Sequence, residues 1–130
     1  MIFYVGLYEA RSSIIDKAHV LAKESGSKLI ITSDINSIGN QDVIYTDTWI
    51  SMGMETEAKK REQDFAGFTV DQELMEAANS EAIFLHCLPA YRGFEVSAEV
   101  IDGPQSVIWQ EAENRLHAQK ALMAWLAEQN

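Results

Sequence analysis

Short apolar runs rich in β-branched residues alternate along this chain with longer stretches of helical periodicity. Runs of this length fit strands, and the helical stretches fit the crossovers that join parallel neighbours. The runs show no clean alternation of apolar and polar residues, as expected for strands that helices cover on both faces. The sequence therefore predicts an α/β fold with a mainly parallel sheet. The expected strands are residues 2–7, 29–32, 42–46, 82–86 and 106–109.

The first helical stretch carries signals at both of its ends. Ser12 or Ser13 is expected to cap its N-terminus, because a serine hydroxyl can accept from a free backbone N–H there. The helix is expected to run to about Glu24 and to end at Gly26, since glycine adopts the left-handed conformation of a C-cap at little cost.

Three further helices are expected from spacing and charge. Residues 55–64 form a charged stretch, and a capping-box spacing between Thr69 and Gln72 precedes a short helix near 74–78. The last helix is expected over residues 111–127. Its apolar stripe, expected to pack into the core, consists of Ala112, Leu116, Leu122, Trp125 and Leu126.

Length and composition indicate an ordinary globular domain. At 130 residues, with no internal repeat or linker, residues 1–130 are expected to form a single domain. No apolar run approaches the roughly 20 residues of a membrane span, and the N-terminus shows no signal-peptide pattern. The single cysteine cannot form an internal disulfide, which suits a cytoplasmic location.

The charge of the chain argues against nucleic acid as a partner. Its net charge is −10, with 20 acidic and 10 basic residues, whereas phosphate backbones are bound by clustered Lys and Arg. The densest basic patch, at residues 59–61, is flanked by acidic residues and is expected to be a solvated helix face. An acidic balance is compatible with a cationic small substrate.

Polar residues follow two of the expected strands. The third strand runs into a loop with Asp47, Ser51 and Met52, and the fourth runs into Cys87 and Leu88. Because the carboxyl ends of parallel strands meet at one edge of a sheet, we expect a carboxylate, a hydroxyl, backbone amides and a thiol to converge there.

Each of these residue types also has a structural alternative. An Asp after a strand often stabilises a turn, and a lone Cys at a strand end is often a small buried apolar residue. His86 is expected to be a hydrogen-bonded core histidine, because no His/Cys/Glu spacing supports a metal site and no metal or cofactor is indicated. Arg115 could pair with Glu111 one helical turn earlier. The residues alone predict an α/β domain with a polar crevice.

Four segments in matching order and spacing resemble the second, ornithine-binding domain of ornithine carbamoyltransferases. They lie within roughly residues 28–127. Cys87 favours the ornithine enzymes over the aspartate enzymes, which have proline at that place. The resemblance implies a Rossmann-like three-layer sandwich. The segments are DVIYTDTWISMG at 42–53, AIFLHCLPA at 82–90, IDGPQSV at 101–107 and AENRLHAQKAL at 112–122.

The resemblance also implies roles for the residues at the strand ends. Asp47, Ser51 and the Met52 amide would hold the amine and amino-acid portion of ornithine. A carboxylate and a thiol next to the amine suit this chemistry, because an amine with a pKa of about 10.4 must lose a proton before it attacks. Asp47 and Cys87 are therefore the expected catalytic residues.

The carbamoyl side of the reaction would use two further groups. The Leu88 carbonyl would sit beside Cys87 where the amine meets the carbamoyl group, and Arg115 would contact carbamoyl phosphate. Carbonyl and guanidinium groups can stabilise the carbamoyl nitrogen and the phosphate, respectively.

The sequence also departs from the family pattern. It has neither the Ser-Thr-Arg-Thr phosphate loop nor the His-Pro-x-Gln segment of the family's first domain, and no paired asparagines follow residues 4–6. The prediction is a carbamoyltransferase-like amino-acid-binding domain of the arginine biosynthesis family that is inactive alone, binds ornithine weakly and self-associates. Open alternatives are a non-catalytic ornithine-binding or regulatory module that docks on another carbamoyltransferase chain, completion by a separate carbamoyl-phosphate domain, and putrescine or acetylated ornithine as the substrate.

Overall fold

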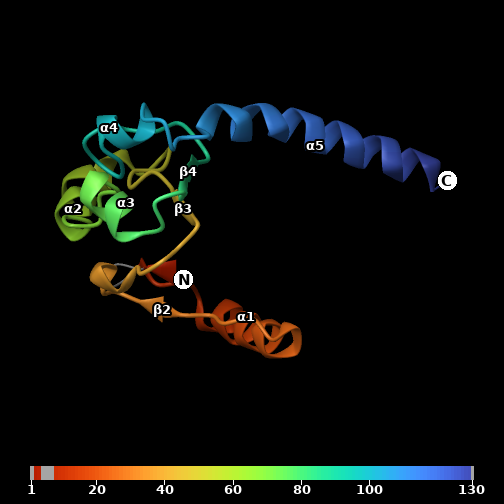
Figure 1. Cartoon of the computed structure of the whole chain (residues 1–130), viewed down its shortest axis with the longest axis horizontal. Coiled ribbons are helices and arrows are strands. Elements are labelled where there is room, and N and C mark those ends of the chain that lie inside the picture. Colours follow the sequence, from red (N-terminus) through yellow and green to blue (C-terminus); the bar gives the residue numbers. More distant parts are fainter. Residues whose placement is uncertain (1, 4–7, 130) are drawn as a thin grey trace.

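The structure of the chain, a computed structural model, describes residues 2–3 and 8–129 (Figure 1). Its strands form parallel pairs. The short 3-10 helices η2 and η3 lie in the loops between the longer elements. The elements in chain order are β1 (Ile2–Phe3), α1 (Ser12–Ser25), β2 (Ile31–Thr32), η2 (Ile35–Ser37), β3 (Val43–Thr46), η3 (Glu55–Glu57), α2 (Ala58–Asp64), α3 (Gln72–Ala77), β4 (Ile83–His86), α4 (Ala98–Ile101) and α5 (Ile108–Glu128).

Both strand pairs are parallel, so the predicted fold class is confirmed. β1 pairs with β2, and β3 pairs with β4 in a register that runs from Val43 opposite Ile83 to Thr46 opposite His86. Each pair forms its own two-stranded sheet. Residues 4–7, the remainder of the first expected strand, lie outside the described residues.

The prediction of a fifth strand at residues 106–109 is wrong. The chain meets β4 only at an isolated bridge between Ser106 and Phe84, where Phe84 donates to the Gln105 carbonyl and accepts from the Val107 N–H. The chain then turns at once into α5, because Ile108 is buried as the first residue of that helix.

The hydrophobic core lies around β3 and β4 and is closed by α3, α4 and the first residue of α5. Its largest fully buried apolar side chains are Phe84, Met75 and Ile108. Further members of this core are Ile38, Ile44, Val70, Ala82, Val96, Val100 and Ile101.

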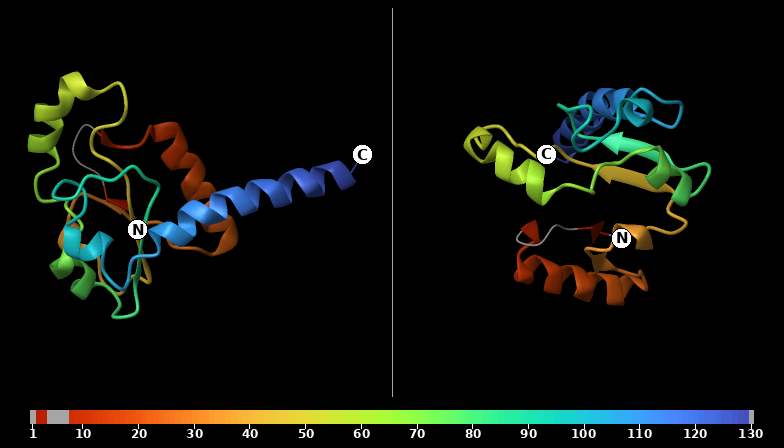
Figure 2. Two further views of the ribbon diagram at one scale, coloured as in Figure 1. Left: turned by 90° about the horizontal axis from the view of Figure 1, so that it is seen from above. Right: turned by 90° about the vertical axis from the view of Figure 1, so that its left-hand side faces the viewer.

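Two helices, α1 and α5, project from the body of the molecule, which is the part that surrounds this core. Both helices extend on the same side of the molecule (Figures 1 and 2). No residue of α1 is buried, and α5 buries only Ile108. The apolar stripe expected to pack into the core is therefore exposed, with Leu116 59% and Trp125 56% accessible, because α5 extends past the body it starts from. The surface area is 9204 Å², against about 6,900 Å² expected for a compact protein of this mass.

The helix-end signals were predicted correctly in one case of three. Gly26 closes α1 in the left-handed conformation, with φ of 72°. Ser12 and Ser13 do not cap α1, because the chain already enters the helix at Arg11 and both serines lie in the first turn.

The capping residue of α3 is also different from the expected one. Asp71, in extended conformation, accepts from the Leu74 N–H at 2.9 Å. The Thr69 hydroxyl donates instead to the Phe94 carbonyl at 2.7 Å, which ties the loop before α3 to the loop after β4.

Tyr8 connects the N-terminal unit, which consists of β1, α1 and β2, with the body, the part of the chain that surrounds β3, β4 and the core. Its hydroxyl donates to Asp64 of α2 at 2.9 Å, and its ring lies 4.7 Å from that of Phe65. Within the described part of the chain, no helix is long and apolar enough to cross a membrane.

The two methionines Met75 and Met52 provide a matched test of this core. Met75 is 2% exposed and Met52 is 90% exposed. Met75→Ala is expected to lower the free energy of unfolding by about 2–5 kcal/mol, because it removes buried methylene and sulfur contacts and leaves a cavity. Met52→Ala is expected to change it by less than about 0.5 kcal/mol. Urea unfolding followed by circular dichroism measures both, and equal losses would contradict the described core.

Candidate functional site

The register of β3 and β4 brings Asp47 and Cys87 together. Thr46 lies opposite His86 in the last pair of the ladder, so the next residue of each strand leaves the sheet beside the other. The Cys87 thiol donates to Oδ1 of Asp47 at 2.9 Å, and the same oxygen accepts from the Thr48 N–H at 2.7 Å. Asp47 therefore stabilises its own turn and contacts the thiol at the same time.

Arg115 of α5 reaches the same place from a third element. Its Nη2 donates to the Cys87 carbonyl at 3.0 Å. Glu111, one turn earlier, accepts from the His86 N–H at 3.0 Å. Arg115 therefore does not form the expected alternative pair with Glu111, and both side chains hold the start of α5 against the end of β4.

His86 and Glu95 form a buried clamp beneath the loop after β4. Both residues are at most 1% exposed, and Nε2 of His86 lies 3.3 Å from Oε1 of Glu95. The Leu88 N–H donates to Nδ1 of His86 at 2.8 Å, and the Tyr91 N–H donates to Oε1 of Glu95 at 2.6 Å. Because Nδ1 accepts, the ring proton is on Nε2 and faces Glu95. The expectation of a hydrogen-bonded core histidine is confirmed.

The clamp supports an unusual backbone. Leu88 has φ of 56°, in the left-handed region, and its peptide bond to Pro89 is cis. A leucine in this region is uncommon and requires surrounding contacts that favour it. The hydrogen bond from the Leu88 N–H to His86 is such a contact, and it fixes the direction of the backbone that follows Cys87.

The electrostatic setting keeps the thiol protonated at neutral pH. Burial raises the pKa of the Cys87 thiol, and the hydrogen bond and negative charge of Asp47 raise it further. Partial burial raises the pKa of Tyr45 to about 12, with Cys87 and Glu111 acting in the same direction. A carboxylate next to a neutral thiol and a neutral phenol leaves a negative charge at this edge, which favours a cationic group.

Ser51 and Met52 lie in the exposed loop after β3. The Ser51 carbonyl accepts from the Met54 N–H at 3.0 Å, and the Gly53 N–H donates to Glu55 at 2.9 Å. Among the contacts of the described residues, none joins Ser51 or Met52 to the Asp47–Cys87 pair. The structure brings together three of the predicted positions, Asp47, Cys87 and Arg115, and leaves the hydroxyl and the Met52 amide in the neighbouring loop.

A pocket of about 540 Å³ lies beside this cluster along β3. It shares Tyr45 and Asp47 with the cluster, but most of its lining is apolar and belongs to other residues, among them Trp49, Phe65 and Leu74. We place the chemistry at the strand ends, where the carboxylate, thiol and guanidinium meet. Within the described ranges no group of three or more His, Cys, Asp or Glu residues could hold a metal ion.

Sequence reasoning missed Tyr45, Glu111 and Glu95 as parts of the site. Tyr45 alternates with buried Ile44 along β3, and this period of two could have assigned its side chain to one face of the sheet. Glu95 carries no such signal, because its partner His86 is nine residues away and the intervening residues form a loop without regular periodicity.

In open parallel α/β folds, small polar ligands bind beyond the carboxyl ends of the strands. This chain brings a carboxylate and a thiol together at that place, with a guanidinium from α5 beside them. A family model described as "Aspartate/ornithine carbamoyltransferase, Asp/Orn binding domain" matches residues 2–126. The chain belongs to this family and is an amino-acid-binding domain of the ornithine carbamoyltransferase type, which confirms the resemblance seen in the sequence.

Curated relatives share high identity with the chain over part of their own length. The ornithine carbamoyltransferase of Caldicellulosiruptor saccharolyticus is 58% identical over 120 residues, which are 92% of this chain and 39% of the relative. That of Wolinella succinogenes is 55% identical over 120 residues, again 92% and 39%. The chain thus spans about two fifths of the relatives it matches.

Solved structures agree with the fold. The anabolic ornithine carbamoyltransferase of Campylobacter jejuni superposes with a TM-score of 0.91 at 41% identity. The match covers 99% of this chain and 43% of the Campylobacter jejuni chain. The enzyme of Pyrococcus furiosus gives a TM-score of 0.83 at 47% identity, over 90% and 38% of the two chains. An N-acetyl-L-ornithine transcarbamylase complexed with carbamyl phosphate and N-succinyl-L-norvaline gives a TM-score of 0.77 at 36% identity, over 92% and 37%.

The His86–Glu95 clamp can be tested by its effect on stability. Glu95→Leu is expected to lower the free energy of unfolding by about 1–3 kcal/mol, because it leaves the Tyr91 N–H without its acceptor. Glu95→Gln keeps one acceptor oxygen and is expected to lose less. Glu81→Leu, at an exposed position, is the control. Chemical unfolding of the three variants measures the order, and a stable Glu95→Leu protein would rule the clamp out.

The coupling between Asp47 and Cys87 can be tested by the pH dependence of thiol alkylation. A neighbouring carboxylate disfavours the thiolate, so Asp47→Asn is expected to lower the pKa of Cys87 and to speed its reaction with iodoacetamide near pH 8. Glu73→Gln removes one negative charge from the exposed face of α3 and is expected to leave the rate unchanged. A rate in Asp47→Asn at or below that of the parent chain would show that Asp47 does not control the thiol.

Proposed function

We propose that this chain binds ornithine or a closely related amine at the carboxyl ends of β3 and β4, as the amino-acid half of a carbamoyl-transfer site. The observation that carries the proposal is the hydrogen bond between Cys87 and Asp47 beside the Arg115-bound carbonyl of Cys87. It supplies a negative charge and a neutral hydrogen-bonding group within reach of one amine. The family assignment supports an amino acid as the ligand.

Asp47 and Cys87 are proposed as the groups that receive the amine. Asp47 already accepts two hydrogen bonds at Oδ1, so its second oxygen is oriented for a third donor. A substrate ammonium would donate to this carboxylate and orient its nitrogen next to the thiol. The ammonium first loses one proton to solvent, and the neutral amine nitrogen then forms the bond to the carbamoyl carbon. The bond from that carbon to the phosphate oxygen breaks, and the phosphate leaves with the electron pair of that bond and takes up the second proton that the nitrogen loses.

Arg115 and the Leu88 carbonyl are proposed as the carbamoyl phosphate side of the site. A guanidinium has five N–H donors, so Arg115 can hold the Cys87 carbonyl and a phosphate oxygen together. The Leu88 carbonyl belongs to the backbone that His86 fixes, which suits a group that must accept from the carbamoyl nitrogen.

Ser51 and Met52 are proposed to complete the site from the neighbouring loop. Both residues are exposed, and the loop carries Gly53 with φ of 87°. Closure of this loop over the amine would add the Ser51 hydroxyl and the Met52 amide to the contacts of Asp47. The loop is thus proposed to bind the amino-acid portion only when ligand is present.

The chain is proposed to bind carbamoyl phosphate only when a partner domain is supplied, because it matches about 39% of its relatives' length. It is proposed to act in the cytoplasm in arginine metabolism and to form homo-oligomers, with no membrane and no nucleic acid as partners. The similarity to an N-acetyl-L-ornithine transcarbamylase keeps acetylated ornithine as a second candidate substrate. A non-catalytic ornithine-binding module that docks on another carbamoyltransferase chain would use the same amine contacts.

The purified chain, given ornithine and carbamoyl phosphate, is expected to make no citrulline above background. Holding two reactants together contributes up to roughly 7–11 kcal/mol to such a transfer, and the sequence contains no phosphate loop for the second reactant. The assay is colorimetric detection of citrulline. Production that scales with protein concentration and is lost in Cys87→Ala would show that the chain is a complete enzyme.

Ornithine is expected to bind at millimolar concentration or weaker, with loss of binding in Asp47→Asn. The charge-assisted hydrogen bond to the amine contributes about 1.5–3 kcal/mol, and its removal weakens binding roughly ten- to a hundredfold. Calorimetry or chemical-shift titration with ornithine, putrescine and acetylated ornithine measures the affinities, with Glu73→Gln as the charge-matched control. Equal affinity in Asp47→Asn and in the parent chain would contradict the proposed amine site.

A further inference from the structure

The pocket of about 540 Å³ along β3 adjoins the proposed amine site. Its volume falls in the range of about 300–1,000 Å³ that holds small organic ligands in proteins. Asp47 and Tyr45 belong both to this pocket and to the cluster at the strand ends. The lining extends from there along β3 to Gln41 and Ile38, which precede the strand. A ligand whose ammonium contacts Asp47 can therefore place its other atoms in the pocket.

The pocket has an exposed polar end and a buried apolar part. Asp47 and Tyr45 are exposed, whereas Trp49 and Val70 are at most 8% exposed. The Phe65 ring lies 5.6 Å from that of Trp49, so aromatic surface forms part of the wall. Apolar ligand atoms that enter this part leave water, which favours binding.

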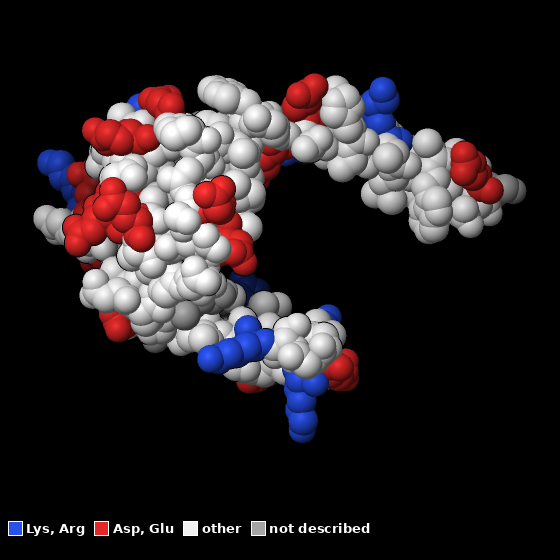
Figure 3. Space-filling view, in the orientation of Figure 1, with Lys and Arg blue, Asp and Glu red and all other residues white. Residues whose placement is uncertain are grey.

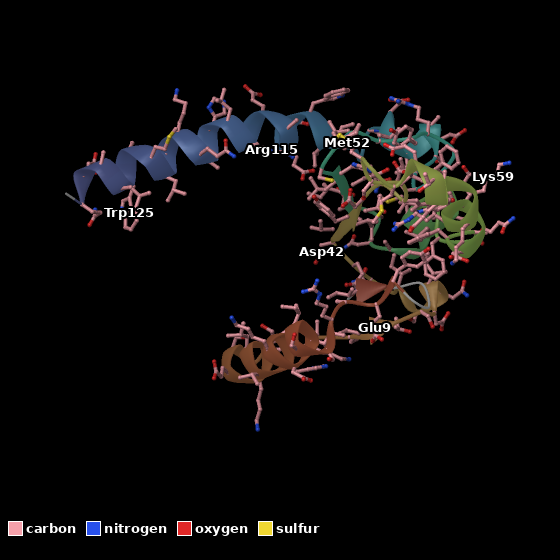
Figure 4. The ribbon with its side chains drawn as sticks, turned by 180° about the vertical axis from the view of Figure 1, so that it is seen from behind. Glu9, Asp42, Met52, Lys59, Arg115 and Trp125 are labelled. Atoms are coloured by element: carbon pink, nitrogen blue, oxygen red, sulfur yellow. The ribbon has the colours of Figure 1, made fainter. Side chains whose placement is uncertain are left out.

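The charges around the pocket favour a cation. Asp47 is the one charged side chain among the described residues that line it, and no Lys, Arg or His is among them. Arg115 lies outside this lining on α5, and Figure 4 shows it at the end of the body away from Asp42, the residue before β3. The net charge of the chain is −10, and Figure 3 shows acidic side chains gathered over the body. The pocket thus attracts an ammonium and offers no partner to a carboxylate.

We propose that this pocket binds a primary monoamine with an aromatic or branched apolar body and no carboxylate. In the complex, the ammonium donates to Asp47, and the apolar body lies against Trp49, Val70 and Leu74. The inference rests on Asp47 as the amine partner of the proposed function, and it names the class of amine that the site prefers. Ornithine fills the pocket poorly, because its second ammonium and its carboxylate would leave water without partners among apolar side chains.

Three ligands that share a phenyl group separate the contributions to binding. 2-Phenylethylamine represents the proposed class, 2-phenylethanol lacks the charge, and phenylalanine adds a carboxylate. At pH 7 the amine is protonated, since an alkylamine such as the lysine side chain has a pKa of about 10.4. Chemical-shift titration of the parent chain is expected to show that 2-phenylethylamine binds about tenfold or more tightly than 2-phenylethanol, phenylalanine or ornithine.

Methyl resonances of the parent chain locate the bound ligand without a mutation. 2-Phenylethylamine is expected to shift the methyl resonances of Val70 and Leu74, which line the pocket. Those of Leu122 and Met123 are expected to stay unchanged. These two side chains on α5 are 55% and 63% exposed, so they report on unspecific apolar binding.

Asp47→Asn tests the ionic contact and keeps an oxygen that can accept from the Thr48 N–H. It is expected to weaken 2-phenylethylamine about tenfold or more and to leave 2-phenylethanol unchanged. Glu73→Gln, on the exposed face of α3, is the charge-matched control.

The outcomes separate this inference from the proposed function. Ornithine binding that depends on Asp47, without binding of 2-phenylethylamine, would overturn the inference and leave the amine site in place. Binding of both amines that is unchanged in Asp47→Asn would overturn both. Phenylalanine bound as tightly as the amine would overturn the proposed class of ligand. Shifts at Leu122 and Met123 in place of Val70 and Leu74 would overturn the pocket as the site.

Discussion

The parallel pairing of β3 with β4 is the constraint on which the site and most of the core depend. It sets Asp47 beside Cys87, because both residues leave the sheet after the same rung of the ladder. It also buries Phe84, around which the chain returns at residues 105–107 to start α5. A one-residue slip would turn every side chain of a strand to the opposite face and separate the carboxylate from the thiol.

Local sequence signals predicted the strands and the convergence of their ends. The β-branched runs placed β3 and β4 almost to the residue, and parallel pairing then implied that Asp47 and Cys87 meet. The expectation for residues 106–109 was wrong, because a short apolar run looks the same whether it pairs along a strand or enters the core as the first turn of a helix. The difference lies in the tertiary contact of Ile108, which periodicity does not encode.

The packing of α5 and the His86–Glu95 clamp lay beyond the sequence for two separate reasons. The apolar stripe of α5 was read as core, since a pattern shows that a helix face avoids water and not which molecule covers it. Glu95 looks like a surface residue, as glutamate usually is, and only the folded loop places it against an imidazole and a backbone N–H. Both cases depend on contacts between segments that the local pattern does not relate.

Arg115 donates to the main-chain carbonyl of Cys87 and not to its side chain. The contact that positions the backbone of the site is therefore separate from the reactive thiol. Every amino acid at position 87 offers the same carbonyl, so the position of the loop is independent of the group that stands there. His86 and Glu95 likewise hold main-chain N–H groups, at Leu88 and Tyr91. A fold arranged in this way can exchange the residue at its reactive position for another without rebuilding the loop that presents it.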